Sequence, residues 1–138
     1  MLLAVLCSLL AIVAMARWTA GGKEIIPWRT DFNAAVKEAQ ATHRPLMLYF
    51  TADWCGPCQS LKGTLWADPQ VEKTLRNFVP VKIDEDQHPD IAQRFPGNYI
   101  PRYVIVDPEL QQSKTTDGVL TSAEFITWLS QPKSQNDK

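Results

Sequence analysis

The sequence lacks an excess of charge of either sign. Its 138 residues include 14 Lys and Arg against 15 Asp and Glu, which gives a net charge of −1. Binding to nucleic acid or to an acidic membrane surface needs a basic imbalance, so neither partner is expected. The sequence also lacks internal repeats and low-complexity tracts. Its length and its 45% of apolar residues fit one domain with one hydrophobic core.

Cysteine and histidine are scarce. The three cysteines are Cys7, Cys55 and Cys58, and the two histidines are His43 and His88. Cys7 falls in an apolar N-terminal run, so only a pair three positions apart remains for the rest of the chain. A zinc site would need both histidines with this pair, and their spacing resembles no compact zinc module. We expect no metal and no separate cofactor; a zinc site and an inert structural disulfide stay open as minor alternatives.

Residues 1–16 form the one long apolar run. The run is short for a bilayer span, which needs about 20 residues. It ends in Ala14-Met15-Ala16, a small-x-small pattern typical of a signal cleavage site. No Lys or Arg precedes it, so an uncleaved membrane anchor stays open beside a cleaved signal peptide. Both interpretations export the chain to a compartment in which a disulfide can persist.

The remaining sequence divides into a linker at residues 17–23, a domain at 24–131 and a polar tail at 132–138. Alternating apolar runs and helical spacings predict the elements of the domain. Strands are expected at 24–28, 46–50, 78–84, 102–106 and 111–116. Helices are expected after Asp31, from about Cys55 through Leu65, at 69–77, at 89–95, and after Thr121, which with Glu124 forms a capping box. This alternation predicts an α/β fold with a central mixed β-sheet and helices on both faces.

The segment Trp54-Cys55-Gly56-Pro57-Cys58 carries the strongest chemical signal. It follows a continuous apolar strand and begins a helix. Unpaired N–H groups at a helix start favour a thiolate, so we expect a lowered pKa and a nucleophilic role for Cys55. Cys58, one turn further in, would attack Cys55 in a mixed disulfide and release the reduced substrate. Pro57 suits a first helical turn, and Gly56 lets a partner's backbone approach.

This pentapeptide resembles the active site of the thioredoxin family, and the resemblance runs from about residue 24 to residue 131. It implies a thioredoxin fold and a thiol–disulfide oxidoreductase activity. By the same resemblance, Ile100-Pro101 corresponds to the family's cis-proline dipeptide, and Gly118 to a glycine of the substrate groove. The resemblance then implies an apolar docking patch around Cys55 that comprises Trp54, Tyr99, Ile100, Pro101, Gly118 and Val119.

Two positions depart from the family's pattern. Thioredoxins place a buried Asp six residues before the first cysteine, and here that position is Tyr49. A phenol ionises near pH 10, so Tyr49 is a poor base at neutral pH, and water or Asp53 would have to serve the proton transfer instead. Gly63 stands where the family often has a proline that bends the active-site helix, and a glycine permits the same bend.

The leader and Tyr49 favour the exported branches of the family. The run from Tyr49 to Cys55 resembles the thioredoxin-like domain of the membrane thiol reductase that supplies the bacterial periplasm. The Gly-Pro dipeptide favours a reducing potential, nearer about −270 mV than about −120 mV. We therefore predict a monomeric reductase of disulfide-containing proteins, secreted into the periplasm or anchored to the inner membrane through residues 1–16, with a membrane thiol electron donor.

Three other functions stay open. They are a non-catalytic binding or assembly module, a disulfide oxidant or isomerase, and a reductant for cytochrome c maturation, whose relatives usually carry an insertion that this chain has no room for. Among the charged residues, we interpret Lys82 and Asp84 as a solvated strand end rather than an active-site pair. Glu85 and Asp86 are interpreted as loop charges. The two histidines are expected to face solvent, and Trp28, Trp66 and Trp128 to pack in the core.

Overall fold

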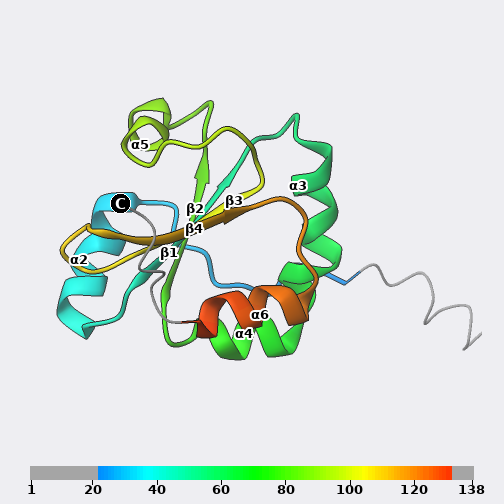
Figure 1. The fold of residues 1–138 in the computed structure, drawn as a ribbon, viewed down its shortest axis with the longest axis horizontal. Helices are drawn as coiled ribbons and strands as arrows, with labels where there is room; N and C mark the ends of the chain where they lie inside the picture. Colours follow the sequence, from blue (N-terminus) through cyan, green and yellow to red (C-terminus); the bar gives the residue numbers. More distant parts are fainter. Residues whose placement is uncertain (1–21, 132–138) are drawn as a thin grey trace, which may run out of the picture.

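A computed structural model describes residues 22–131 of the chain (Figure 1). The apolar run with Cys7, the first part of the linker and the polar tail lie outside the described residues. Four strands form one sheet in the order β2-β1-β3-β4. Strand β1 (Leu46–Thr51) is parallel to β2 (Val79–Asp84) and antiparallel to β3 (Arg102–Val106). Strand β4 (Gln112–Asp117) forms the far edge, antiparallel to β3, so the predicted mixed sheet is confirmed.

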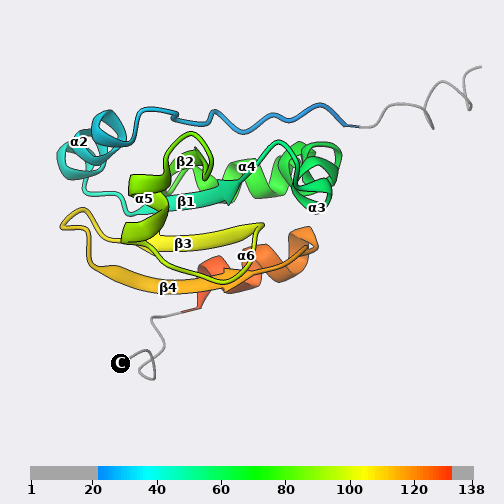
Figure 2. The same cartoon turned by 90° about the horizontal axis from the view of Figure 1, so that it is seen from above.

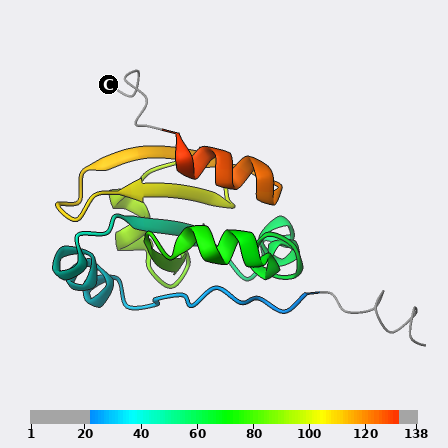
Figure 3. The same ribbon diagram turned by 90° about the horizontal axis from the view of Figure 1, so that it is seen from below.

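Helices cover both faces of this sheet, as predicted. Helices α2 (Phe32–Thr42) and α5 (Pro89–Arg94) pack on one face, on the Leu46, Leu48 and Phe50 side of β1. Helices α4 (Pro69–Leu75) and α6 (Ser122–Ser130) pack on the other, on the side of Met47 and Tyr49 (Figures 2 and 3). Because successive side chains of a strand point to opposite faces, the apolar run of β1 serves both cores.

Short polar side chains fix where the long helices begin. The Asp31 carboxylate accepts a 2.9 Å hydrogen bond from the N–H of Ala34 at the start of α2. The Asp68 carboxylate does the same for α4, at 2.7 Å from the N–H of Gln70. At α6 the predicted capping box is present, with Thr121 and Glu124 bonded in both directions. These caps satisfy backbone donors that the first helical turn leaves free.

The prediction of a strand at residues 24–28 is wrong. This segment runs extended along the β2 edge of the sheet (Figure 2), and only Arg29 forms a bridge, with Val81. The N–H of Arg29 donates to Pro80 O at 2.9 Å, and its carbonyl accepts from Lys82 N at 2.9 Å. Pro27 and Pro80 have no N–H, so a longer ladder lacks donors on both sides. The missing donor of Pro80 faces this edge, which leaves the β1–β2 ladder intact.

The helix expected from Cys55 through Leu65 is shorter than predicted. Helix α3 spans Gly56–Ser60, and two 3₁₀ turns follow, η1 (Leu61–Gly63) and η2 (Leu65–Ala67). Thr64 separates the turns with φ −121° and ψ −94°, so the course of the chain changes directly after Gly63. Leu61 and Leu65 still face the core, as their helical spacing predicts. The short helix places the cysteine pair at its first turn.

Candidate active site

The two cysteines lie just beyond the C-terminal end of β1. A tight turn joins strand to helix, with a 3.1 Å hydrogen bond from the N–H of Cys55 to Ala52 O. Cys55 is the N-cap of α3 and is disulfide-bonded to Cys58, with their Cα atoms 5.3 Å apart. The N–H of Cys58 donates to the sulfur of Cys55 at 3.3 Å. This amide would stabilise negative charge on that sulfur once the disulfide is reduced.

The disulfide is covered, although its surroundings are open. Only 3% of Cys55 and 1% of Cys58 is exposed, whereas 70% of the adjoining Trp54 is exposed. Gly56 and Pro57 are also exposed, and a Cβ added at Gly56 would meet nothing within 4 Å. Open space thus lies beside Cys55 at Gly56, next to the exposed Trp54.

A cis peptide bond between Ile100 and Pro101 lies against the disulfide. The carbonyl oxygen of Ile100 is 3.9 Å from the sulfur of Cys55, and Ile100 packs on the small cluster of Ala52 and the two cysteines. The N–H of Gly118 donates to Pro101 O at 2.8 Å, while the Tyr103 hydroxyl donates to Gly118 O at 3.1 Å. Gly118 has φ +88°, which side-chain-bearing residues rarely adopt. The structure thus brings Ile100, Pro101 and Gly118 together beside Cys55.

The expected docking patch is less apolar than the sequence suggested. Trp54, Tyr99 and Ile100 line one hollow, but the charged or polar side chains of Glu85, Asn98 and Arg102 also line it, together with Gly97. The buried guanidinium of Arg102 donates to Glu85 at 2.6 Å, and the Trp54 indole donates to Asp86 at 2.9 Å. Glu85 and Asp86 thus lie in the loop after β2, as expected, and each side chain has a partner in the site. Val119 is 58% exposed beside Gly118 and does not line this hollow.

Arg102 is the site residue that sequence reasoning missed. It is 3% exposed and directly follows the cis proline, at the start of a strand whose other residues are apolar or aromatic. Charged residues are rarely buried unless they are paired, so one cation inside an otherwise apolar strand was a usable signal.

Tyr49 occupies the place of the family's buried carboxylate. Its hydroxyl donates to Cys58 O at 3.4 Å, and its ring packs against Trp28, Trp66 and Tyr103. Burial raises the pKa of Tyr49 above its ordinary value of 10, with a smaller contribution from the charge of Glu24. Tyr49 is thus a neutral hydrogen-bond donor behind the disulfide at neutral pH. Asp53 is exposed on the rim and lines a separate polar hollow with Thr51, Gln59 and Lys82 among others.

Lys82 is not the solvated strand end that the sequence suggested. Its Nζ lies 3.1 and 3.2 Å from the carboxylate oxygens of Glu24, and both side chains are about three-quarters buried. The Trp28 indole donates to the same carboxylate at 2.6 Å. These bonds tie the N-terminal segment to β2. Asp84 also has defined partners, since its carboxylate accepts from the N–H groups of residues 86 and 87.

Both histidines are at least partly exposed. His43 is exposed at the end of α2, and His88 is partly exposed at the start of α5. Within residues 22–131, no three His, Cys, Asp or Glu side chains gather in a way that could hold a metal ion. Over the same residues, every helix is too short or too polar to cross a bilayer.

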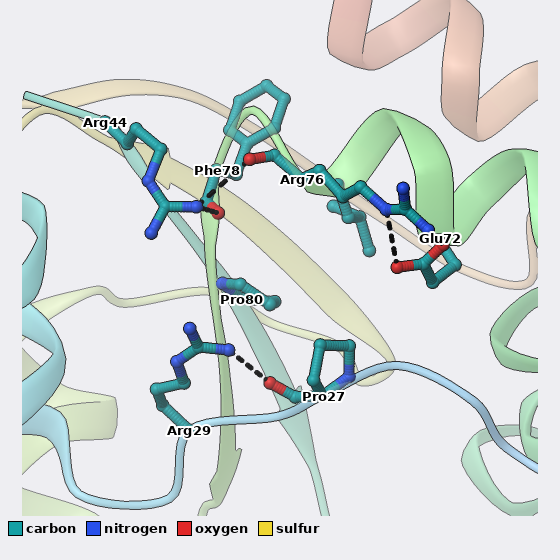
Figure 4. A pocket seen from close by; sticks show the side chains of 8 residues that line it. Pro27, Arg29, Arg44, Glu72, Arg76, Phe78 and Pro80 are labelled. Carbon is teal, nitrogen blue, oxygen red and sulfur yellow. Dashed lines mark hydrogen bonds and ion pairs between the residues drawn. The ribbon is translucent and has the colours of Figure 1, made fainter. Parts of the chain in front are cut away.

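A further hollow lies between the N-terminal segment, β2 and α4 (Figure 4). Three guanidinium groups line it, but each is already bound. Arg29 pairs with Glu38 at 2.7 Å and donates to Pro27 O. Arg44 pairs with the same carboxylate and donates to the carbonyls of residues 76 and 78, while Arg76 pairs with Glu72. Arg44 thus connects the chain before β1 to the chain before β2, at the opposite end of β1 from the disulfide.

This arrangement of sheet, helices and cysteine pair defines a thioredoxin-type protein. A family model described as thioredoxin-like matches residues 27–108, and the chain belongs to this family. Thioredoxin-like protein slr0233 from Synechocystis is 34% identical over 87 residues, which cover 62% of this chain and 79% of that protein. Thioredoxin Y2, chloroplastic, from Arabidopsis thaliana is 31% identical over 56% of this chain and 45% of its own length. The chain thus spans about half the length of some of its curated relatives.

Solved structures show the same fold. A thioredoxin from Thermus thermophilus superposes with a TM-score of 0.67 at 26% identity, over 75% of this chain and 84% of that one. The C-terminal domain of DsbD from Neisseria meningitidis, in its oxidised form, superposes with a TM-score of 0.63 at 23% identity, over 73% and 95%. The second likeness is one of fold, and it agrees with the predicted α/β architecture.

Proposed function

We propose that this protein is a thiol–disulfide oxidoreductase that reduces disulfides of other proteins outside the cytoplasm. The observation that carries the proposal is the Cys55–Cys58 disulfide at the first turn of α3, beside the cis Ile100-Pro101 bond. An inert structural disulfide would not need open space at Gly56 and an exposed Trp54 next to it. Family membership supports the same general activity.

The reaction is a two-electron exchange. In the reduced protein, the Cys55 thiolate attacks one sulfur of the substrate disulfide, and the other substrate sulfur leaves as a thiolate that takes up a proton. The thiol of Cys58 then loses its proton and attacks the sulfur of Cys55. The bond between Cys55 and the substrate breaks, the second substrate thiol leaves, and the protein disulfide forms. A dithiol donor must reduce that disulfide before the next cycle.

The proton of Cys58 needs an acceptor in this scheme. Tyr49 contacts the carbonyl of Cys58 but stays neutral, because burial raises its pKa. The proton therefore passes to water, or to Asp53 by a less direct route. The hydroxyl of Tyr49 acts instead on the backbone, which it holds at the position of the second cysteine.

The reducing direction and the compartment rest on sequence features. Gly56-Pro57 favours a potential near about −270 mV, at which the dithiol form passes electrons outward. Residues 1–16 favour export to the bacterial periplasm, cleaved or anchored to the inner membrane. A reductase there needs a membrane thiol donor, and a monomer suffices for the chemistry.

Equilibration with glutathione buffers tests the reducing direction. The Cys55–Cys58 pair should equilibrate at about −270 mV, and a value of about −120 mV would overturn the reductase proposal in favour of an oxidant.

Protease protection of the full chain in bacterial cells tests the compartment separately. Digestion as soon as the outer membrane is opened supports the periplasm. Resistance until the inner membrane is lysed contradicts it. The double variant Cys55→Ser, Cys58→Ser tests the binding-module alternative, which gains support only if this variant fully restores a deletion phenotype.

A further inference from the structure

We propose that Arg102 is a positioning residue for the proposed reaction: it holds the segment at residues 97–100 beside the disulfide in the geometry that a protein substrate requires. The inference deepens the proposed function, on which it rests. It concerns how a large substrate docks rather than the reactivity of the cysteines.

One guanidinium group connects three parts of the site. Arg102 lies directly opposite Phe50 in the β1–β3 register, and its guanidinium carbon is 4.3 Å from the centre of that ring. Its Nη2 donates to Glu85 at 2.6 Å, in the loop after β2. Its Nη1 donates to Tyr99 O at 3.2 Å, in the segment that precedes the cis proline. A planar group with several fixed donors can make these contacts together, which a lysine ammonium at the same place cannot.

Gly97 shows how closely the segment lies on this side chain. A Cβ added at Gly97 would be 2.4 Å from Cδ of Arg102 and 2.8 Å from its Nε. These are distances that real Cβ atoms do not adopt, and Arg102 is too buried to move aside freely. Glycine at position 97 thus permits the segment to rest on the arginine stem.

Stability of the fold alone does not explain the Arg102–Glu85 ion pair. Within the described residues, Nε of Arg102 is buried and has no hydrogen-bond partner. Such a donor is costly, and buried ion pairs are often replaced by apolar side chains without loss of stability. The contacts of Arg102 instead fix positions. Arg102 holds the Tyr99 carbonyl, and the next carbonyl oxygen, that of Ile100, lies 3.9 Å from the sulfur of Cys55.

The position of this segment should matter more for a large substrate than for a small one. Tyr99 and Ile100 line the hollow that also contains Trp54, so their placement shapes the surface on which a protein docks. The hydrogen bonds of Arg102 go to Tyr99 and Glu85 rather than to a cysteine. The N–H of Cys58 donates to the sulfur of Cys55 without the help of Arg102. Loss of Arg102 should thus weaken docking and leave the intrinsic reactivity of the dithiol unchanged.

The test compares a protein disulfide with a small one. In insulin reduction driven by dithiothreitol, Arg102→Met should lower kcat/KM about tenfold, mainly through a higher KM. The rate of the reduced protein with 5,5′-dithiobis(2-nitrobenzoic acid) should stay within about twofold of the native rate. Arg94→Met is the matched control, since Arg94 also lies over aromatic rings but is exposed and outside the site. It should leave both rates unchanged.

Two further variants guard against misfolding of Arg102→Met. Gly97→Ala keeps the arginine but displaces it, and should produce the same selective rise in KM. The double variant Arg102→Met, Glu85→Met removes both charges, so it should keep the native melting temperature and still raise KM. Arg102→Lys keeps the positive charge, but its ammonium group can contact only one of the partners of Arg102 at a time. Its KM should therefore lie between those of the native protein and of Arg102→Met.

The outcomes separate the proposals. Equal losses with insulin and with the small disulfide, or no loss in Arg102→Met and Gly97→Ala, would overturn the positioning role. If the native protein reduces no protein disulfide, the proposed function fails instead. The positioning role of Arg102 is then tested by hydrogen exchange at the amides of residues 98–100 in the oxidised protein. Faster exchange in Arg102→Met, but not in Arg94→Met, supports this role, and unchanged exchange overturns it.

Discussion

The hydroxyl of Tyr49 donates a 3.4 Å hydrogen bond to the carbonyl oxygen of Cys58, so a phenol rather than a carboxylate stands behind the second cysteine. Burial keeps that phenol neutral by raising its pKa, and the group can orient the backbone but cannot accept the proton of Cys58 at neutral pH. This relationship separates the chain from the thioredoxins with a buried Asp at this position.

Tyr49→Phe tests that interpretation. The variant loses one weak hydrogen bond and no titrating group, so insulin reduction should stay within about threefold of native, with an unchanged pH profile between about pH 6 and 9. The profile is measured with dithiothreitol in excess. A profile whose midpoint moves in the variant would contradict the account, because it would make the phenol part of the proton path.

Alkaline pH should destabilise the fold through two buried phenols. Burial is the main cause that raises the pKa of both Tyr49 and Tyr103 above 10, so the folded state holds protons that the unfolded state releases. The contribution of these two phenols to the free energy of unfolding is therefore fully present below about pH 10. Above that pH the free energy of unfolding falls by about 1.4 kcal/mol per pH unit for each phenol. Urea unfolding at several pH values measures the slope. It should be shallower in Tyr49→Phe and in Tyr103→Phe, and an unchanged slope in both would contradict the assignment.

The side chain of Lys114, on strand β4, caps the C-terminal end of α6. It is 8% exposed, and its Nζ donates to the carbonyls of Trp128, Leu129 and Gln131 at the end of this helix, where backbone carbonyls lack a full set of intrahelical partners. Lys114→Met should lower the free energy of unfolding by about 2 kcal/mol. Lys37→Met, on the exposed side of α2, is the control and should change it by less than about 0.5 kcal/mol. Equal effects of the two variants would refute the capping role.

Gly118 should resist substitution for a backbone reason. Its φ of +88° is strained for any residue with a Cβ, although a Cβ there would meet no atom within 4 Å. Gly118→Ala should therefore cost about 1–2 kcal/mol of stability by urea unfolding. Gly56→Ala, at a position with neither positive φ nor crowding, should be neutral within about 0.5 kcal/mol. A neutral Gly118→Ala would show that the loop relaxes to another conformation.

The sheet and its helices could be predicted because their signals are local. The apolar run of β1 and the caps at Asp31 and Thr121 each depend on a few neighbouring residues, and the structure has the elements there. The predicted strand at residues 24–28 is absent for a non-local reason. Pairing with β2 would need an N–H at Pro80, which lies more than fifty positions further along the sequence. The same segment brings Glu24 to Lys82, a pairing that no spacing in the sequence reveals.

The site divides in the same way. The cysteine pair could be found from its motif, because the chemistry fixes its spacing, whereas the cis proline was expected only from the resemblance of Ile100-Pro101 to the thioredoxin family. The role of Arg102 could not be predicted, since it depends on Glu85 and on the carbonyl of Tyr99, and these meet only after β2 and β3 flank β1. A lone cation in an otherwise apolar strand marks the residue in the sequence, but not its partners.

Trapping of the mixed disulfide shows which cysteine attacks the substrate first. Reduced Cys58→Ser is mixed with a disulfide-containing protein, quenched with acid, and separated on a non-reducing gel, with Cys55→Ser treated in parallel. The account predicts a covalent complex in Cys58→Ser whose linkage maps by mass spectrometry to Cys55, and none in Cys55→Ser. A complex formed through Cys58 in Cys55→Ser, with none through Cys55, would contradict the assigned order of attack, and no complex in either variant would contradict the exchange chemistry itself.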